Sequence, residues 1–280
     1  MESVLDARVA QTTTPIALTI AGSDSGGGAG IQADLKAFSA LGVYGASVIT
    51  ALTAQNTRAV TAVEGVSPKM IRAQIDAVFD DLPVSAVKIG MLAVPEIIEA
   101  VADGLSDHAI PVVLDPVMVA KSGAVLLEPE AISALVERLV PLARVVTPNL
   151  PEAAQILGTT SAGSVSAMQT QGEALLAKGA QAVLMKGGHG QEAVCTDLLI
   201  QPGADPLPFT SDRIETQNTH GTGCTLSSAI AAGLAKGETL ERAVGTAHTY
   251  LNRAILAADQ LQIGSGHGPV HHFHALWGRE

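Results

Sequence analysis

The sequence predicts an α/β protein, a three-layer α/β/α sandwich around a mainly parallel central sheet. Two observations support this fold class. Short apolar runs alternate with amphipathic stretches almost from end to end, which is the pattern of repeated β–α units. Several of these runs are apolar at nearly every residue, which is typical of strands buried on both faces of a parallel sheet.

Six apolar runs are the expected strands, and they cover residues 15–21, 46–54, 84–91, 111–118, 144–147 and 182–186. The expected helices cover residues 30–41, 67–82, 95–105, 130–139, 167–178 and 239–258. The helix over 67–82 has the clearest pattern, because Ser67 can cap it, Pro68 suits its first turn and its apolar residues share one face. Residues 196–214 are interpreted as an excursion of strand and loop.

No stretch rich in proline, glycine or serine marks a linker, and no internal repeat is present. We therefore expect one domain over residues 15–280, preceded by a flexible segment over residues 1–14. In such sheets ligands collect at the carboxyl ends of the strands.

The composition excludes several partners. The formal net charge is −11, aromatic residues make up 2% of the chain, and no Lys/Arg cluster interrupts the acidity. Nucleic-acid binding needs a basic surface and usually aromatic stacking, so nucleic acid is not expected as a partner. No apolar run is long enough to span a bilayer, and the first residues lack a secretory pattern, so we expect no membrane association and a cytoplasmic location. The two cysteines are expected to be free thiols.

Residues 218–230 carry the strongest functional signal. Gly221 and Gly223 flank Thr222, Cys224 follows, and an apolar run that should be helical comes next. Small residues at a helix start leave backbone N–H groups open to an anion such as phosphate. The same position favours an ionised thiol, so the pKa of Cys224 is expected to be lowered. The alternative interpretation is a glycine-rich turn with a small buried cysteine.

A second glycine loop, over residues 22–30, follows the first strand. It lacks the lysine of a Walker A loop, and the acidic residue of a dinucleotide fingerprint is missing further on. A loop that lets a ligand approach the backbone fits better, with Asp24 or Asp34 as its polar group.

Polar residues also follow several expected strands. Lys186 precedes two glycines, where it could reach a nucleotide phosphate. Asp115 ends another strand, and Asn149 and Glu152 follow a third. Their oxygens suit magnesium shared with phosphate. Taken singly, such residues are also common as helix caps and turn formers.

The histidines leave two further alternatives open. His271, His272 and His274 could form a metal clip near the C-terminus. His220 could pair with Cys224 as in cysteine hydrolases, although the carboxylates at the strand ends would then have no role.

Over residues 17–277 the chain resembles the hydroxymethylpyrimidine/phosphomethylpyrimidine kinases of thiamine biosynthesis, which have the ribokinase-like fold. The matching segments are residues 19–34, 53–57, 88–92, 115–118, 147–152, 185–189, 218–224 and 268–273. The resemblance implies phosphoryl transfer from ATP with Mg²⁺, first to 4-amino-5-hydroxymethyl-2-methylpyrimidine and then to its monophosphate. It also implies a homodimer.

The resemblance further implies roles for single residues. The aminopyrimidine would be held by Ala29, Asp34, Gln55, Met91 and Val117. Magnesium and phosphate would be held by Asp115, Asn149 and Glu152. The nucleotide would be bound by Lys186, Thr222 and Gly223. The anion hole and base would be Gly221, Gly223 and Cys224, with Lys186 beside them in catalysis. Two rival interpretations are pyridoxal kinase, which shares the fold, and a catalytically silent binding protein for a pyrimidine or vitamin.

Overall fold

The computed structural model describes residues 13–119, 129–188 and 192–277. Within these residues nine strands form one sheet in the order β3-β2-β1-β4-β5-β6-β7-β8-β9. The strands are β1 (Ile16–Asp24), β2 (Tyr44–Gln55), β3 (Val60–Gly65), β4 (Ala86–Ile89), β5 (Val112–Leu114), β6 (Val145–Val146), β7 (Val183–Met185), β8 (Val194–Ile200) and β9 (Leu207–Asp212). Neighbours from β2 to β7 run parallel, and antiparallel pairs close the sheet at both ends.

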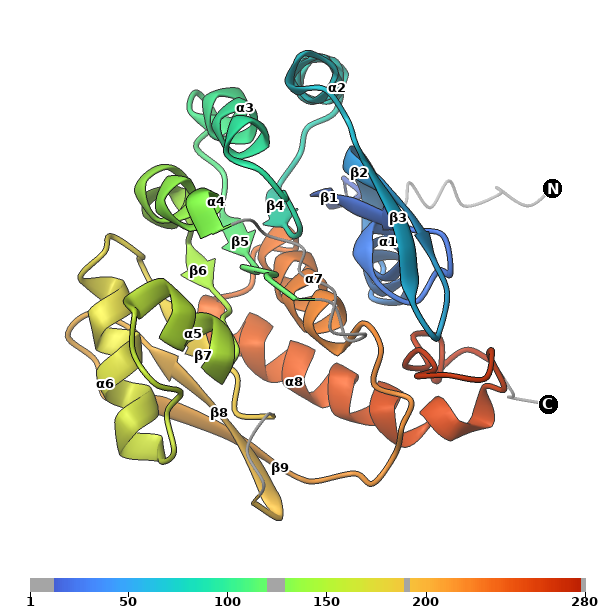
Figure 1. The fold of residues 1–280 in the computed structure, drawn as a ribbon, viewed down its shortest axis with the longest axis vertical. Coiled ribbons are helices and arrows are strands. Elements are labelled where there is room, and N and C mark those ends of the chain that lie inside the picture. The colour runs from blue at the N-terminus through green and yellow to red at the C-terminus, as the bar shows by residue number, and fades with distance from the viewer. Residues whose placement is uncertain (1–12, 120–128, 189–191, 278–280) are drawn as a thin grey trace, which may run out of the picture.

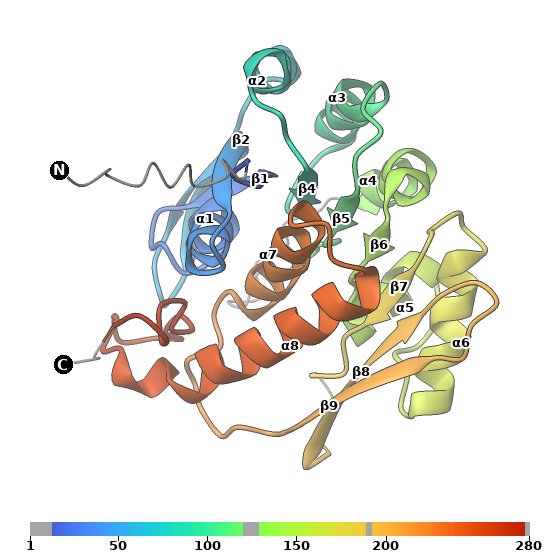
Figure 2. The ribbon, with the colours of Figure 1, turned by 180° about the vertical axis from the view of Figure 1, so that it is seen from behind.

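Helices cover both faces of the sheet (Figures 1 and 2), which confirms the three-layer sandwich. One face carries α1 (Gly30–Ala40), α7 (Thr222–Ala235) and α8 (Leu240–Leu256). The other carries α2 (Pro68–Asp81), α3 (Pro95–Leu105), α4 (Pro129–Ala134), α5 (Leu150–Leu157) and α6 (Val165–Leu176). After α4 the chain continues as a π-helical turn, Leu135–Leu139, and a 3-10 turn, Val140–Leu142; a further 3-10 turn, Ala258–Gln260, follows α8.

Alternating strand residues fill two separate cores. In β5, Val112 and Leu114 belong to the core beneath α2–α6, whereas Val113 belongs to the core beneath α1, α7 and α8. Successive strand side chains point to opposite faces, so an apolar run supplies both cores at once. This explains why the strand signals in the sequence are apolar at nearly every position.

All six predicted strands and all six predicted helices are present, with bounds shifted by a few residues. Ser67 caps α2 as expected, since its side chain accepts the backbone N–H of Met70. The excursion over 196–214 is the antiparallel pair β8 and β9. The prediction of a flexible N-terminal segment falls mostly on residues 1–12, which lie outside the described residues.

Two elements were not predicted. The edge strand β3 is exposed at nearly every residue, so no apolar run marks it. Helix α5 has only eight residues, and its start coincides with polar residues that were interpreted as metal ligands. No helix of the described residues combines the length and the apolar character that crossing a bilayer requires.

Candidate active site

A cavity of about 710 Å³ opens at the carboxyl ends of the parallel strands. The glycine loop after β1, the first turn of α7, the ends of β4 to β7 and part of α8 line it. The candidate site residues were expected at this edge of the sheet. Twelve of them line this cavity. They are Ala29, Gln55, Met91, Asp115, Val117, Asn149, Glu152, Lys186, Gly221, Thr222, Gly223 and Cys224.

The glycine-containing segment that was predicted to bind an anion forms the N-terminus of a helix, as expected. Helix α7 starts at Thr222, and Gly221 precedes it in the left-handed region with φ of 83°. No side chain caps the helix, and the residues of its first turn, Thr222, Gly223 and Cys224, line the cavity. A Cβ atom at Gly221 would overlap the carbonyl oxygen of Gly28. The loop over residues 218–223, called the anion loop below, therefore packs directly on the glycine loop.

Cys224 lies in the first turn of α7, and its pKa does not follow the expectation. Burial raises the pKa of the thiol to about 11, although Lys88 and the backbone N–H of Gly30 act in the opposite direction. The prediction of a lowered pKa is wrong for the unliganded protein, because desolvation outweighs the helix terminus. Cys224 is therefore a protonated thiol at neutral pH.

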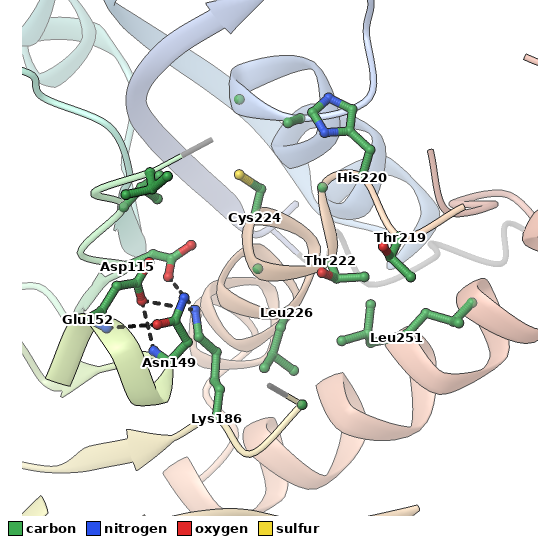
Figure 3. Close-up of a pocket in the computed structure, with 18 of the residues that line it drawn as sticks. Asp115, Asn149, Glu152, Lys186, Thr219, His220, Thr222, Cys224, Leu226 and Leu251 are labelled. Atoms are coloured by element: carbon green, nitrogen blue, oxygen red, sulfur yellow. Dashed lines mark hydrogen bonds and ion pairs between the residues drawn. The ribbon is translucent and has the colours of Figure 1, made fainter. Parts of the chain in front are cut away.

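Lys186 and two carboxyl groups form the charged wall of the cavity (Figure 3). The Nζ atom of Lys186 lies 2.7 Å from Oδ1 of Asp115 and 3.9 Å from Oε2 of Glu152. Thr147 and Ser227 also donate to Asp115. Burial lowers the pKa of Lys186, but the two carboxylates outweigh it and keep the ammonium charged.

The negative charge of the Glu152 carboxylate is only partly balanced by Lys186. Burial, with Asp115 nearby, raises the pKa of Glu152 to about 7 even though Lys186 opposes the shift. A buried carboxyl group with a raised pKa is a place where added positive charge is stabilising.

Asn149 forms a helix cap, the role that the sequence left open as the alternative to metal binding. Its side chain accepts the backbone N–H of Glu152, and the Glu152 side chain accepts the backbone N–H of Asn149. This capping box starts α5. The amide oxygen of Asn149 is thus engaged in orienting Glu152, whose carboxyl group also accepts the backbone N–H of Met118.

The other end of the cavity holds a hydrogen-bonded group that the sequence did not reveal. Nε2 of His220 lies 2.8 Å from Oδ2 of Asp24 and 3.2 Å from the Gln55 amide nitrogen. Asp24 also accepts the backbone N–H groups of Gly26, Gly28 and Ala29, and so shapes the glycine loop. His220 is engaged with Asp24, which argues against the thiol–histidine pair. Because 196 residues separate Asp24 from His220, no spacing signal could have shown this contact.

Among the predicted site residues, Asp34 alone does not line the cavity. Its side chain is fully buried and pairs with Lys88 at 2.9 Å. Thr19 and Ser228 donate to the same carboxylate. Its position in the predicted helix α1 is right, but the side chain points to the core, so we withdraw its assignment to substrate contact.

Apolar side chains line a further part of the cavity, beside the anion loop. Leu226 of α7 and Leu251 of α8 face this space (Figure 3), and Ile255 extends it along α8. These residues were not singled out in the sequence, where they are indistinguishable from core positions of amphipathic helices. His189, which follows Lys186 in the predicted phosphate segment, lies outside the described residues.

Comparison with known proteins identifies the family of this chain. Residues 24–271 match the family model described as phosphomethylpyrimidine kinase. The chain belongs to this family. A hydroxymethylpyrimidine/phosphomethylpyrimidine kinase of Rhizobium meliloti (strain 1021) is 63% identical over 94% of this chain and 99% of its own length. The enzyme of the same name from Escherichia coli (strain K12) is 53% identical over 93% and 98%.

Solved structures of the phosphomethylpyrimidine kinase family and of pyridoxal kinases share the fold. Bacillus subtilis pyridoxal kinase in complex with ADP superposes with a TM-score of 0.87, at 38% identity over 95% of this chain and 100% of that one. Phosphomethylpyrimidine kinase from Clostridium difficile 630 gives 0.75, at 48% identity over 86% and 99%. The ribokinase-like α/β fold is thereby confirmed.

Proposed function

We propose that this protein is an ATP-dependent kinase that phosphorylates 4-amino-5-hydroxymethyl-2-methylpyrimidine and then its monophosphate, giving the diphosphate used in thiamine biosynthesis. One observation carries the proposal: the uncapped start of α7, with Cys224 in its first turn, opens into the same cavity as Lys186, Asp115 and Glu152. This arrangement suits phosphoryl transfer, and membership of the phosphomethylpyrimidine kinase family identifies the acceptor.

The pyrimidine occupies the end of the cavity near the glycine loop. Gln55 offers both an amide oxygen and an NH₂ group to the edge of the ring. Met91 and Val117 supply apolar contact, and the backbone at Ala29 closes one side. Asp24 and His220 hold this end in shape through the glycine loop and Gln55.

The nucleotide occupies the opposite end, between the anion loop and α8. The backbone N–H groups of Thr222, Gly223 and Cys224 bind the transferring phosphoryl group, because they converge at a helix N-terminus. Lys186 contributes a fixed positive charge to the phosphates, and Leu226 and Leu251 give apolar contact to the base.

The two carboxyl groups of the charged wall, Asp115 and Glu152, suit a magnesium ion that arrives with the nucleotide. Within the described residues no group of three or more His, Cys, Asp or Glu side chains could hold a metal alone. Asp115 and Glu152 would hold the ion together with phosphate oxygens and water, which is the usual mode for magnesium. The raised pKa of Glu152 supports this, since the carboxyl lacks compensating charge. When bound, the ion neutralises charge on the phosphates, and Asn149 keeps Glu152 oriented.

In the first step the substrate hydroxyl oxygen bonds to the γ-phosphorus, and the bond to the bridging oxygen breaks with its electron pair leaving on ADP. The hydroxyl proton goes to the thiolate form of Cys224. This form is scarce at neutral pH because the pKa of the thiol is raised to about 11. A scarce base suffices, because the transition state is loose and the alcohol proton leaves late. In the second step the acceptor is an ionised phosphate and needs no base.

We also propose that residues 15–280 act as one domain, that the protein is a homodimer and that it works in the cytoplasm. The single sheet formed by the described strands supports the first statement, and the family resemblance supports the other two.

The decisive experiment measures ADP release with Mg²⁺ and ATP, with hydroxymethylpyrimidine, its monophosphate and pyridoxal offered in parallel. We expect turnover of both pyrimidines well above that of pyridoxal. Preference for pyridoxal is the second candidate outcome, because pyridoxal kinases share the fold at a TM-score of 0.87. Absence of turnover with every acceptor would favour a binding protein.

A further inference from the structure

The segment after α8 passes the hairpin of β2 and β3 and then pairs with the anion loop. We call residues 266–272 the tail strap. The backbone N–H of His267 donates to the carbonyl of Thr57 at 2.9 Å, next to the turn between β2 and β3. Figure 1 shows this red segment beside the tip of that hairpin. The tail strap thus holds the outer edge of the sheet where Gln55 lies.

The same strap also holds the anion loop. The backbone N–H of His220 donates to the carbonyl of Gly268 at 3.0 Å. The N–H of Gly268 donates to Oδ1 of Asn218 at 3.0 Å. A Cβ atom at Gly268 would overlap the Asn218 side chain, so the strap lies against that side chain as closely as glycine permits. The position of His220, and through it that of Asp24 and the glycine loop, depends on these contacts.

His272 connects the strap to the first turn of α7. Its Nε2 atom lies 3.0 Å from Oγ1 of Thr225. The Thr225 hydroxyl donates its single proton to the carbonyl of Gly221 at 2.8 Å, which leaves its oxygen to accept from Nε2 of His272 in the tautomer that carries the ring hydrogen there. Burial lowers the pKa of His272 to about 3, with Lys36, His271 and His274 adding to the shift, so the ring is neutral at neutral pH.

We propose that the tail strap positions the anion loop against the glycine loop, and that His272 is a positioning residue that acts on Gly221 through Thr225. The inference rests on the proposed function, since it assigns the anion loop to the transferring phosphoryl group. It gives the C-terminal Gly-Pro-Val-His-His segment a role in the site. His271 is anchored separately, through its backbone N–H to the carbonyl of Ala254.

The test compares two substitutions of His272 in the full chain. His272→Gln can keep an N–H donor near the Nε2 position, whereas His272→Met fills similar space without a donor. With Mg²⁺, ATP and hydroxymethylpyrimidine we expect kcat to fall about tenfold in His272→Met, the factor that one lost hydrogen bond at a buried group typically gives. We expect the KM for ATP to change less than kcat, because Leu226, Leu251 and Lys186, which also hold the nucleotide in the proposed site, lie outside the strap. His272→Gln should stay within about twofold of the wild type.

A second measurement does not depend on catalysis. Hydrogen exchange of the peptide that covers residues 218–226, read by mass spectrometry without ligand, should be about tenfold faster in His272→Met and near wild type in His272→Gln. Thr225→Val removes the other partner of the hydrogen bond and should reproduce the His272→Met result, so it replaces that variant should His272→Met not fold.

The proposal is overturned if folded His272→Met and Thr225→Val keep wild-type kcat and exchange, or if His272→Gln is as impaired as His272→Met, since packing alone would then explain the effect. Inactivity of the wild type itself would refute the proposed function instead, and the exchange data would still decide on the strap.

Discussion

Lys88 and Asp34 form an ion pair at 2.9 Å, and neither side chain is exposed to solvent. Both carboxylate oxygens of Asp34 accept from the ammonium, and Thr19 and Ser228 complete their hydrogen bonds. Burial lowers the pKa of Lys88, but Asp34, together with Cys224 and Asp115, outweighs it, so the ammonium is charged. The pair joins β1, β4, α1 and α7 beneath the cavity.

Asp34→Asn should destabilise the protein by about 3–5 kcal/mol, because it leaves a buried ammonium without its counter-ion. The double variant Asp34→Asn/Lys88→Met removes both charges and should recover most of this loss. Urea unfolding of both variants at neutral pH provides the measurement. Equal instability of the single and double variants would mean that packing and the Thr19 and Ser228 hydrogen bonds, rather than the unpaired charge, determine the effect.

Cys224→Ala should lower turnover of the free pyrimidine by about 10²–10⁴-fold, which is the usual contribution of a general base. Turnover of the monophosphate should suffer less, since that acceptor needs no base. Parallel steady-state assays with the two acceptors supply the comparison, and circular dichroism confirms the fold. Cys195→Ser is the matched control for loss of a thiol elsewhere in the cavity. An equal loss with both acceptors would assign Cys224 to positioning instead.

The first step should accelerate with pH over an unusually wide range. The pKa of the Cys224 thiol is raised to about 11, so below that value the thiolate fraction grows about tenfold per pH unit. We expect kcat with the free pyrimidine to rise up to about pH 10 without levelling near 8.5, the ordinary value for a thiol. The monophosphate reaction and Cys224→Ala should lack this rise. A plateau below pH 8.5 would show that bound substrates lower the pKa of the thiol.

Glu152→Gln should stabilise the unliganded protein at high pH. The folded-state pKa of Glu152 is raised to about 7, so the native state holds its proton more tightly than the unfolded chain. The resulting stability is fully present below the unfolded pKa of about 4.5 and is lost as pH rises through 7. We expect the variant to exceed the wild type by roughly 1–3 kcal/mol at pH 8, and the difference to vanish near pH 4.

Chemical denaturation at the two pH values measures this difference, with exposed Glu64→Gln as the control. Addition of Mg²⁺ and ATP should reverse the order at pH 8, because the wild type gains a ligand contact that the variant lacks. Persistence of the variant's advantage with Mg²⁺ and ATP would argue against Glu152 as a holder of the ion.

The sequence was informative where local chemistry decides structure. The β–α units were predictable, because strands buried on both faces need apolar residues throughout. The start of α7 was predictable from Gly221 and the apolar run that follows it. By contrast, β3 lies exposed at an edge and carries no such signal.

Properties that depend on burial or on distant contacts were beyond the sequence. A helix start predicts a lowered pKa for Cys224, but the surrounding protein raises it, and only the packed structure reveals which influence dominates. Asp34 and Lys88 are 54 residues apart, so their pairing depends on the adjacency of α1 and β4. Asn149 and Glu152 were interpreted as metal ligands, with a helix cap as the alternative for each, and the structure shows that together they form a capping box.

The packing of Gly221 on the carbonyl of Gly28 has a consequence for how this scaffold can change. The loop that recognises the acceptor and the loop that binds the transferring group share one backbone contact with no side chain between them. A new acceptor that needed the glycine loop to move outward would pull the phosphate-binding amides out of line. Adaptation to other acceptors is therefore confined to side chains around the cavity, such as those at Gln55, Met91 and Val117, while the two loops change together or not at all.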